Sequence, residues 1–373
     1  GKGLKDLYTL KAGVGLAVPL LRGRGATATA SRERAATIEQ EAAELDLSHQ
    51  RSVSALRTIG AYWALVAAQE SVKMAEASLK LQTSIAELTD GLIKVGDMPG
   101  IELSRAQAGV ARANAQVQDA QKRVRTARIE LATAMGLATS GDEATLPTAA
   151  DGFPAFDAAP SAATLDGLPI DARGDVVAAD RRQAAGQVLV EGAGTELRSK
   201  LDLSGRAYYT ALDESTLNNT IDRWVGPSVD FTAEYEKPLG NNRAKGALAQ
   251  AEADLRGRRI AYGDLRRQAR LRAQANMQSL PDAAALVRLS RQAKELYDKA
   301  YQSELERLKA GESTLIDTLL TEQQYTDSNL SLVAAQQELA QLIAQLRFES
   351  GTLLEGGRPT LQTLTTPPAG GGR

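Results

Sequence analysis

A large internal repeat limits the folds open to this chain of 373 residues more than any other feature. A strand-like segment ends at a Pro-Leu pair twice, at Pro19 and at Pro238, and a long Ala-rich stretch follows each pair. A Gly turn then comes at Gly96 in the first copy and at Gly311 in the second, 215 residues apart. Such a large unit, repeated at a nearly constant spacing, indicates a tandem duplication and an internal two-fold repeat in the fold.

The first copy predicts a pair of long antiparallel helices. Residues 24–94 contain no proline and are dense in Ala, Glu, Gln and Arg, so they are predicted to form one helix of about 105 Å at 1.5 Å per residue. Small and apolar residues in the return helix alternate in steps of four and three, the heptad seam of a coiled coil. They are Ala106, Val110, Ala113, Val117, Ala120, Val124, Ala127, Leu131 and Ala134. We therefore expect an antiparallel hairpin with its tip at residues 95–101.

The second copy predicts a similar hairpin with one irregularity. Its return helix has a seam at Leu332, Ala335, Leu339, Leu342 and Leu346. The partner helix is predicted to present Leu286, Leu289, Ala293, Leu296 and Ala300. Pro281 lies inside this partner helix, where its ring and its missing N–H are predicted to kink or break the helix. The first copy has no proline at the matching place.

Three segments with alternating polarity predict strands, at residues 4–19, 199–212 and 223–238. In the first of them, Val14, Leu16 and Val18 alternate with small residues. A polar loop at residues 213–220 joins the other two into a hairpin. An apolar face opposite a polar face fits either a soluble sandwich or a membrane-spanning sheet. The pattern leaves both open.

These segments divide the chain into four regions. Residues 1–136 form the first repeat, with strand, long helix, tip and return helix, and residues 137–172, rich in Ala, Pro, Gly and Asp, form an irregular connection at the equator of the helical part. Residues 173–350 form the second repeat, with a helix, a β-hairpin, a long helix, a tip and a return helix. Residues 351–373 are predicted to be a disordered tail.

Composition excludes several kinds of chemistry. The chain has no Cys and one His, which excludes a Cys-based metal site, a disulfide framework and a thiol nucleophile. The net charge of -2 gives no basic footprint for nucleic acid. We find no catalytic triad, no phosphate-binding loop and no zinc-protease motif, and we expect neither an enzyme nor a cofactor or metal site. No run of about 18 apolar residues predicts a transmembrane helix.

One acidic residue follows each Gly turn at an equivalent place, Glu102 in the first copy and Asp317 in the second. Each is predicted to lie in the first turn of a return helix. There it either complements the helix dipole, worth about 0.3–1 kcal/mol, or faces a common axis in an oligomer. The sequence pattern leaves both interpretations open.

With these features together, the sequence resembles the TolC family of outer-membrane efflux and secretion channels. The resemblance is carried by the two Pro-Leu junctions and by the tips "VGDMPGIELSRAQAGVARANAQVQDA" and "AGESTLIDTLLTEQQYTDSNLSLVAAQQELAQL". The second tip follows the family pattern G-x-x-(T/S)-x-x-D-x-L, from Gly311 to Leu319. The resemblance covers roughly residues 10–350. Each motif alone is modest evidence for this family. The occurrence of the motifs twice, in the same order and at nearly the same spacing, is specific to it.

The resemblance implies a mainly α fold with a minor β part. Long coiled-coil hairpins, residues 24–135 and 241–350, would build an α-barrel tunnel in the periplasm, and the strands would join a shared β-barrel in the outer membrane of a Gram-negative cell. The resemblance further implies a homotrimer in contact with outer-membrane lipid. Such a trimer is the passive exit duct of a tripartite efflux pump or type I secretion system, working with a periplasmic adaptor protein and an inner-membrane pump. No nucleic acid partner is implied.

The resemblance also implies roles for individual residues. Asp317 matches the acid that lines the periplasmic aperture, and Glu102 has the matching place at the first tip. The next acid of the ring falls on Leu320, so a weaker cation-binding ring is expected. Residues expected to meet the adaptor are Gly96, Asp97, Gly311, Glu312 and Ser313, and those at the strand–helix junctions are Pro19 and Pro238.

Two alternatives accompany this interpretation. Family members begin with a helix and a first strand before the segment that starts here, so we expect the chain to be N-terminally incomplete or a shortened member. The other candidate function is a periplasmic coiled-coil structural or adaptor protein outside the membrane. An adaptor would have one helical hairpin flanked by β-rich modules, whereas this chain predicts two hairpins, each preceded by a strand.

Overall fold

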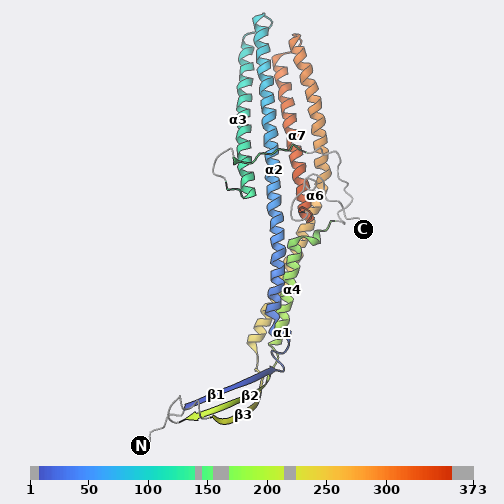
Figure 1. Ribbon diagram of the computed structural model, residues 1–373. Coiled ribbons are helices and arrows are strands. Elements are labelled where there is room, and N and C mark those ends of the chain that lie inside the picture. The colour runs from blue at the N-terminus through green and yellow to red at the C-terminus, as the bar shows by residue number, and fades with distance from the viewer. Residues whose placement is uncertain (1–7, 139–144, 154–167, 214–223, 355–373) are drawn as a thin grey trace. The chain divides into compact units, whose positions relative to one another are not determined.

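The computed structural model describes residues 8–138, 145–153, 168–213 and 224–354 (Figure 1). Its elements in the first half are β1 (Tyr8–Pro19), α1 (Ala26–Thr29), α2 (Ser31–Lys94), α3 (Ile101–Met135) and the 3-10 turn η3 (Ile170–Ala172). They are followed by α4 (Gly174–Thr195), β2 (Lys200–Asp213), β3 (Trp224–Glu236), α6 (Asn242–Lys309) and α7 (Leu315–Glu349). Contacts divide the chain into two units, residues 1–46 with 175–265 and residues 47–174 with 266–373.

The first unit contains an antiparallel sheet in the order β1-β2-β3, and all three predicted strands are present within the described residues. The register places Leu16 of β1 opposite Gly205 of β2, and Gly205 opposite Phe231 of β3. Successive side chains point to opposite faces, so these residues share an apolar face, on which Phe231 is 81% exposed. Asp202 and Glu234, also paired in register, belong to the polar face.

The predicted helix at residues 24–94 is interrupted near its start. α1 ends at Thr29 and α2 begins at Ser31, so the prediction of one continuous helix is wrong there. Ser31 packs against Gly192 of α4, where an added Cβ would lie 2.3 Å from the Ser31 hydroxyl oxygen. The contact between these helices therefore requires a residue without a side chain at position 192.

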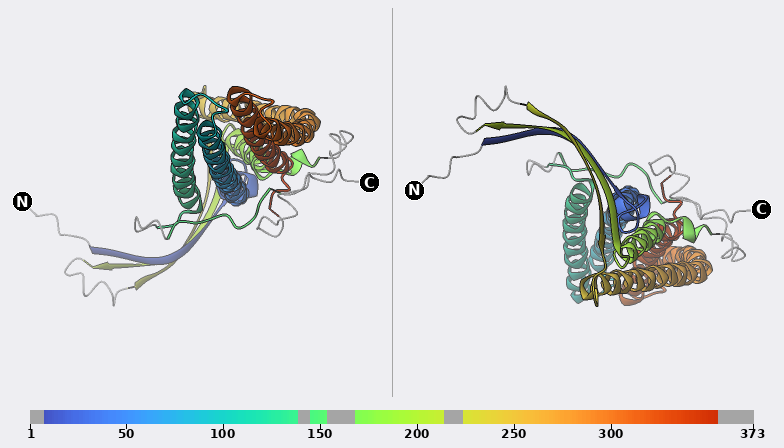
Figure 2. Two further views of the ribbon diagram at one scale, coloured as in Figure 1. Left: turned by 90° about the horizontal axis from the view of Figure 1, so that it is seen from above. Right: turned by 90° about the horizontal axis from the view of Figure 1, so that it is seen from below.

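The second unit contains the tip-side parts of both helical hairpins, namely α3, α7 and residues 47–94 of α2 and 266–309 of α6. In Figures 1 and 2, α2 lies between α3 and α7, and α6 lies on the far side of α7. The return helices α3 and α7 are each 35 residues long. The predicted seam of α3 is largely confirmed. Its buried residues include Ala106, Ala113, Val117, Ala120, Ala127 and Leu131.

The prediction for the seam of α6 is wrong. Of the five residues predicted to form its seam, Leu289 is 55% and Leu296 is 58% exposed. The buried residues of α6 in this unit lie elsewhere: Ala269, Ala273, Met277, Leu280, Ala283, Val287, Tyr301 and Leu308. Periodicity identifies an apolar stripe, but it does not say which neighbour covers it. The helix also continues through Pro281, so the predicted break is absent, whereas a kink at this residue stays a prediction.

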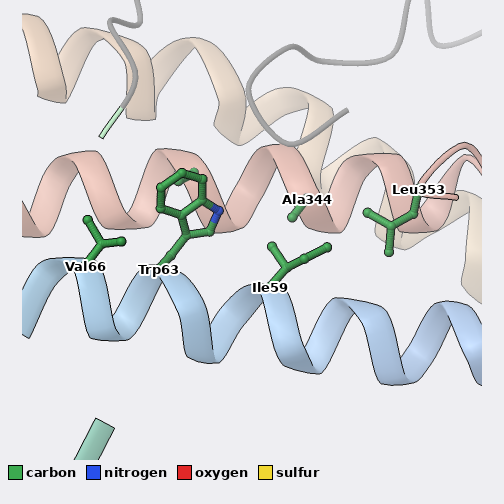
Figure 3. Packing of buried hydrophobic residues seen from close by; sticks show 6 residues of the cluster. Ile59, Trp63, Val66, Ala344 and Leu353 are labelled. Carbon is green, nitrogen blue, oxygen red and sulfur yellow. The ribbon is translucent and has the colours of Figure 1, made fainter. Parts of the chain in front are cut away.

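An apolar core joins α2 to α7 in the half of the unit far from the tips (Figure 3). Ile59, Trp63 and Val66 of α2 face Ala344 of α7 and Leu353. The rest of the cluster is Ala340, with Ala149, Phe153 and Phe348 packed around it. The Trp63 and Phe153 rings stack with centroids 5.6 Å apart.

Several predictions fall wholly or partly outside the described residues. They concern the irregular connection (139–144 and 154–167), the polar loop (214–223) and the tail (355–373). The division of the chain into the regions 1–136, 137–172, 173–350 and 351–373 stays a prediction. Among the helices of the described ranges, none combines the length and apolarity needed to cross a bilayer.

Candidate functional site

Both long helices end at their tips in the same backbone motif. Gly96 and Gly311 adopt left-handed conformations, with φ of +88° and +74°. At the first tip, Gly96 N–H donates to the Ile93 carbonyl at 3.0 Å, and Asp97 N–H donates to the Leu92 carbonyl at 2.9 Å. This pair of hydrogen bonds is the Schellman motif, which satisfies carbonyls left unpaired at a helix end.

The second tip repeats these hydrogen bonds at equivalent positions. Gly311 N–H donates to the Leu308 carbonyl at 3.1 Å, and Glu312 N–H donates to the Arg307 carbonyl at 2.9 Å. Gly311 therefore ends α6 in a Schellman motif, at the place where the sequence predicts the chain to turn back. The duplication therefore extends to individual backbone hydrogen bonds.

The return helices also end in matching motifs, which the sequence interpretation missed. Gly136 and Gly351, again 215 residues apart, have φ of +69° and +71°. Leu137 N–H donates to the Ala132 carbonyl at 3.0 Å, and Thr352 N–H donates to the Arg347 carbonyl at 2.9 Å. A Gly shortly beyond the end of a periodic helical pattern is the signal that would have found them.

The two acids after the turns have different local environments. Asp317 is exposed in the first turn of α7, and its N–H donates to Thr314 Oγ1 at 3.2 Å. The Thr314 hydroxyl in turn donates to Asp317 Oδ2 at 2.6 Å, so the two residues form a reciprocal cap. Glu102 lies in the first turn of α3 and accepts from Arg105 Nη1 at 3.0 Å. Helix α3 has Gly100 as its N-cap, with no side-chain cap.

A groove of about 550 Å³ lies beside the second tip. Asp317, Leu320, Gly311, Glu312 and Ser313 all border it, so the structure brings together five residues that the sequence singled out. Positive and negative groups both line this groove, because Arg307 and Glu304 are also on its wall.

A second groove, of about 330 Å³, lies between α3 and α7. Arg105 and Arg112 line one side, Ile316 and Leu319 line the other, and Leu320 borders both grooves. Glu102 borders neither of these grooves, but it accepts a hydrogen bond from Arg105, which lines the second.

The other predicted positions lie at the first tip and at the junctions. Asp97 is exposed beside Gly96. Pro19 ends β1, and the next residue, Leu20, donates its N–H to the Leu201 carbonyl at 2.7 Å. Pro238 lies between the end of β3 and the start of α6.

A buried polar cluster between the hairpins was not predicted. Glu322 of α7 is 2% exposed. Its carboxylate accepts from Ser78 Oγ at 2.6 Å and from Thr326 Oγ1 at 2.8 Å, and it also accepts from Gln82 Nε2. Glu322 is one of the buried residues of α7. The predicted seam of this helix begins ten residues later, at Leu332, and so carried no signal for it.

Tyr301 of α6 lies close to this cluster and is 1% exposed. Burial, followed by the charges of Glu322 and Tyr325, raises the pKa of Tyr301 to about 12. Its ring stacks on Tyr325, with centroids 5.9 Å apart. Within the described part of the chain, its hydroxyl has no hydrogen-bond partner.

Comparison with known proteins bears on what this arrangement is for. Residues 5–137 match the family model "Outer membrane efflux protein". No curated protein matches the sequence. The fold is similar to that of solved outer-membrane channels, as follows.

The outer-membrane channel OprN superposes with a TM-score of 0.75 at 20% identity, covering 92% of this chain and 82% of OprN. The CmeC channel of Campylobacter jejuni gives 0.74 at 15% identity, covering 93% and 77%. The outer-membrane protein VceC of Vibrio cholerae gives 0.70 at 20% identity, covering 93% and 87%. The predicted resemblance to the TolC family is confirmed, by the family match over residues 5–137 and by the fold over most of the chain.

Proposed function

We propose that this protein is an outer-membrane efflux channel, the exit duct of a tripartite pump. The observation that carries the proposal is the combination of one amphipathic sheet with two long helical hairpins, in a chain whose residues 5–137 match the outer membrane efflux family. The exposed apolar face of the sheet, with Phe231 on it, suits lipid, and the polar face suits a water-filled path.

The finer parts of this proposal concern assembly and partners. The channel is a homotrimer in which other copies complete the sheet and the tunnel. The tips around Gly96 and Gly311 bind a periplasmic adaptor protein, and an inner-membrane pump supplies the driving force. The protein itself is a passive duct. Support comes from the matched ends of the two hairpins, which present two equivalent tips per copy.

Asp317 is the proposed acid of the periplasmic aperture. Its exposure and its place in the groove beside the tip support this role. Leu320, which is 54% exposed one turn later, adds an apolar group where a second acid would strengthen cation binding. The aperture would therefore bind cations through one ring of carboxylates.

Single-channel recording in planar bilayers tests this role. Asp317→Asn keeps a side-chain oxygen for the Thr314 hydroxyl and removes the charge, whereas Asp317→Ala removes both. We expect both variants to weaken block by multivalent cations on the periplasmic side, by roughly tenfold if about 1.4 kcal/mol of binding energy is lost. Asp97→Asn, which removes an acid from the other tip, is the control and should keep wild-type block.

The outcomes separate the two interpretations of Asp317. Loss of block in Asp317→Ala alone would mean that the cap, and not the charge, matters. Wild-type block in both variants would remove Asp317 from the aperture. A wild-type protein that forms no channel in bilayers, and that is soluble without detergent, would contradict the channel function itself and favour a periplasmic coiled-coil protein.

A further inference from the structure

The groove between α3 and α7 brings basic and apolar side chains together in one unit of the chain. Its volume is about 330 Å³, near the lower end of the range of about 300–1,000 Å³ for small-molecule sites. The residues of its walls that matter here are Arg105, Gly109, Arg112, Ile316, Leu319 and Leu320. No acidic residue is among the described residues that line it.

The floor of this groove is apolar and depends on a glycine. Gly109 of α3 is buried, and an added Cβ there would lie 2.5 Å from Gln82 Oε1 and 3.9 Å from Leu319 Cδ2. The absence of a side chain at this position therefore keeps the floor open. Ile316 is 46% and Leu320 is 54% exposed, so apolar surface remains accessible there. Such a floor suits a ligand with an apolar body.

Arg112 supplies the positive charge of the groove. It is exposed, and none of the ion pairs among the described residues includes it. Arg105, by contrast, donates from Nη1 to both carboxylate oxygens of Glu102 at 3.0 Å, so its charge is compensated. A guanidinium group with free donors binds carboxylates and sulfonates through charge-assisted hydrogen bonds.

The helix that carries Arg112 is basic as a whole. Helix α3 contains six Arg and Lys residues against three Asp and Glu residues, a net charge of +3, whereas the whole chain has a net charge of -2. The groove beside the second tip differs, because Glu304, Glu312 and Asp317 lie on its wall. Leu320 borders both grooves. Of these two neighbouring grooves, the one between α3 and α7 is therefore the one that favours anions.

We propose that the groove between α3 and α7 binds small organic anions that have an apolar body, namely alkyl sulfonates and carboxylates. The anionic group accepts hydrogen bonds from Arg112, and the apolar body lies on Ile316 and Leu320. This inference rests on the proposed channel function, for which it names a class of substrate. One uncompensated charge and an open floor give weak binding, with a Kd on the order of 1 mM. Weak binding suits a conduit, because a substrate in transit has to leave again.

Thiol protection measures binding at this groove alone, because the chain contains no cysteine. Ala108→Cys places one thiol at an exposed position on the groove wall. The probe is 1-octanesulfonate, added to the full chain in amphipol, and the labelling reagent is an uncharged maleimide. At about ten times a millimolar Kd, we expect the probe to slow labelling roughly tenfold, in proportion to the occupied sites.

Two further probes separate the parts of the ligand. Sodium sulfate has the charge without the apolar body, and octyltrimethylammonium has the body with the opposite charge. Neither should slow labelling of the Ala108→Cys protein. Ala111→Cys, at an exposed position of α3 outside the groove, is the control for general effects of the probe. Its labelling rate should be the same with and without octanesulfonate.

Substitutions in the Ala108→Cys background test the assigned side chains. Arg112→Gln removes the charge and should weaken octanesulfonate binding roughly tenfold. Leu320→Asp places an acid on the groove wall and should weaken binding by a similar factor. Lys122→Gln is the matched control, because it removes one positive charge from an exposed position of α3 outside the groove. It should keep wild-type protection. Arg112 and Leu320 are exposed as well, so we expect all three variants to fold.

Equal protection in wild-type and Arg112→Gln backgrounds overturns the inference, and so does equal protection by octyltrimethylammonium. Protection by none of the probes, with protection by an adaptor protein instead, also overturns it and makes the groove a protein-docking surface. Labelling needs no conduction, so it reports on the groove even if no channel forms. Failure of the wild-type protein to conduct, by contrast, contradicts the proposed function. The two failures are therefore distinguishable.

Discussion

Tyr301 shows how one buried hydroxyl couples the stability of the helices to pH. Burial is the largest cause of its raised pKa, of about 12, and the nearby charges of Glu322 and Tyr325 add to it. The unfolded chain has an ordinary tyrosine pKa, close to 10. The folded state therefore holds the phenolic proton more tightly. This contribution to stability is present below pH 10 and is lost as the pH rises from about 10 to about 12.

Replacement of Tyr301 by phenylalanine tests this coupling. Tyr301→Phe removes an unpartnered buried hydroxyl, so we expect equal or higher stability at pH 8, by up to about 1 kcal/mol. It should also remove the share of Tyr301 in the loss of stability between pH 10 and pH 11, which corresponds to about 1 kcal/mol for a pKa raised from 10 to about 12. Urea midpoints in detergent at pH 8, 10 and 11 measure both effects.

Tyr297→Phe on the same helix is the matched control, since Tyr297 is 38% exposed. It should keep the wild-type alkaline profile. An unchanged profile in Tyr301→Phe would show that another group causes the alkaline loss.

At the scale of elements, the ends of the helices are set by glycines. Four left-handed glycines, Gly96, Gly136, Gly311 and Gly351, end four helices with the same pair of hydrogen bonds. Left-handed conformations cost other residues about 1–2 kcal/mol. The lengths of the hairpins are therefore fixed locally, by residues that come in pairs 215 positions apart.

Alanine at the tips should lower stability. Gly96→Ala and Gly311→Ala are each expected to cost about 1 kcal/mol or slightly more, although an added Cβ meets no atom within 4 Å at either position. Gly257→Ala, inside α6 with equally open surroundings, should instead stabilise by up to about 1 kcal/mol. Thermal unfolding of the three variants measures the difference. Tip variants as stable as Gly257→Ala would contradict backbone strain as the reason for glycine there.

Exposed apolar surface is the main feature at the scale of the whole molecule. The α6 residues Leu286, Leu289 and Leu296 are exposed, and so are Val14 and Phe231 on the sheet. Extended apolar surfaces mark interfaces with proteins or membranes. Within the proposed function, the sheet faces lipid and the α6 stripe faces a neighbouring copy.

The mass of the purified complex tests this assembly. We expect the full chain to require detergent and to have three times the chain mass of 39.6 kDa by native mass spectrometry. Leu289→Glu/Leu296→Glu places charges in the proposed contact and should shift the mass toward one chain. Lys299→Glu, at an exposed position of the same helix, should not. A wild-type protein with the mass of one chain would remove the trimer from the proposal.

Much of the fold could be predicted because its signals are local. Strand alternation, the α3 seam and the glycines at both tips were all readable, since they depend on neighbours within a few residues. The candidate site was predicted only in part. Asp317, Leu320 and the tip residues do border one groove, whereas Glu322 was missed, because a charged side chain on a helix is ordinarily a solvated one.

The sequence by itself determined the duplication, the order of strands and helices, and the places where the chain reverses. Tertiary structure alone decided which face of α6 is buried, that the helix continues through Pro281, and that Glu322 lies between α2 and α7. The physical reason is that periodicity tells which residues share a face of a helix. What that face contacts, and hence whether a charge there is hydrated or buried, depends on segments some 240 residues away, such as Ser78 and Gln82.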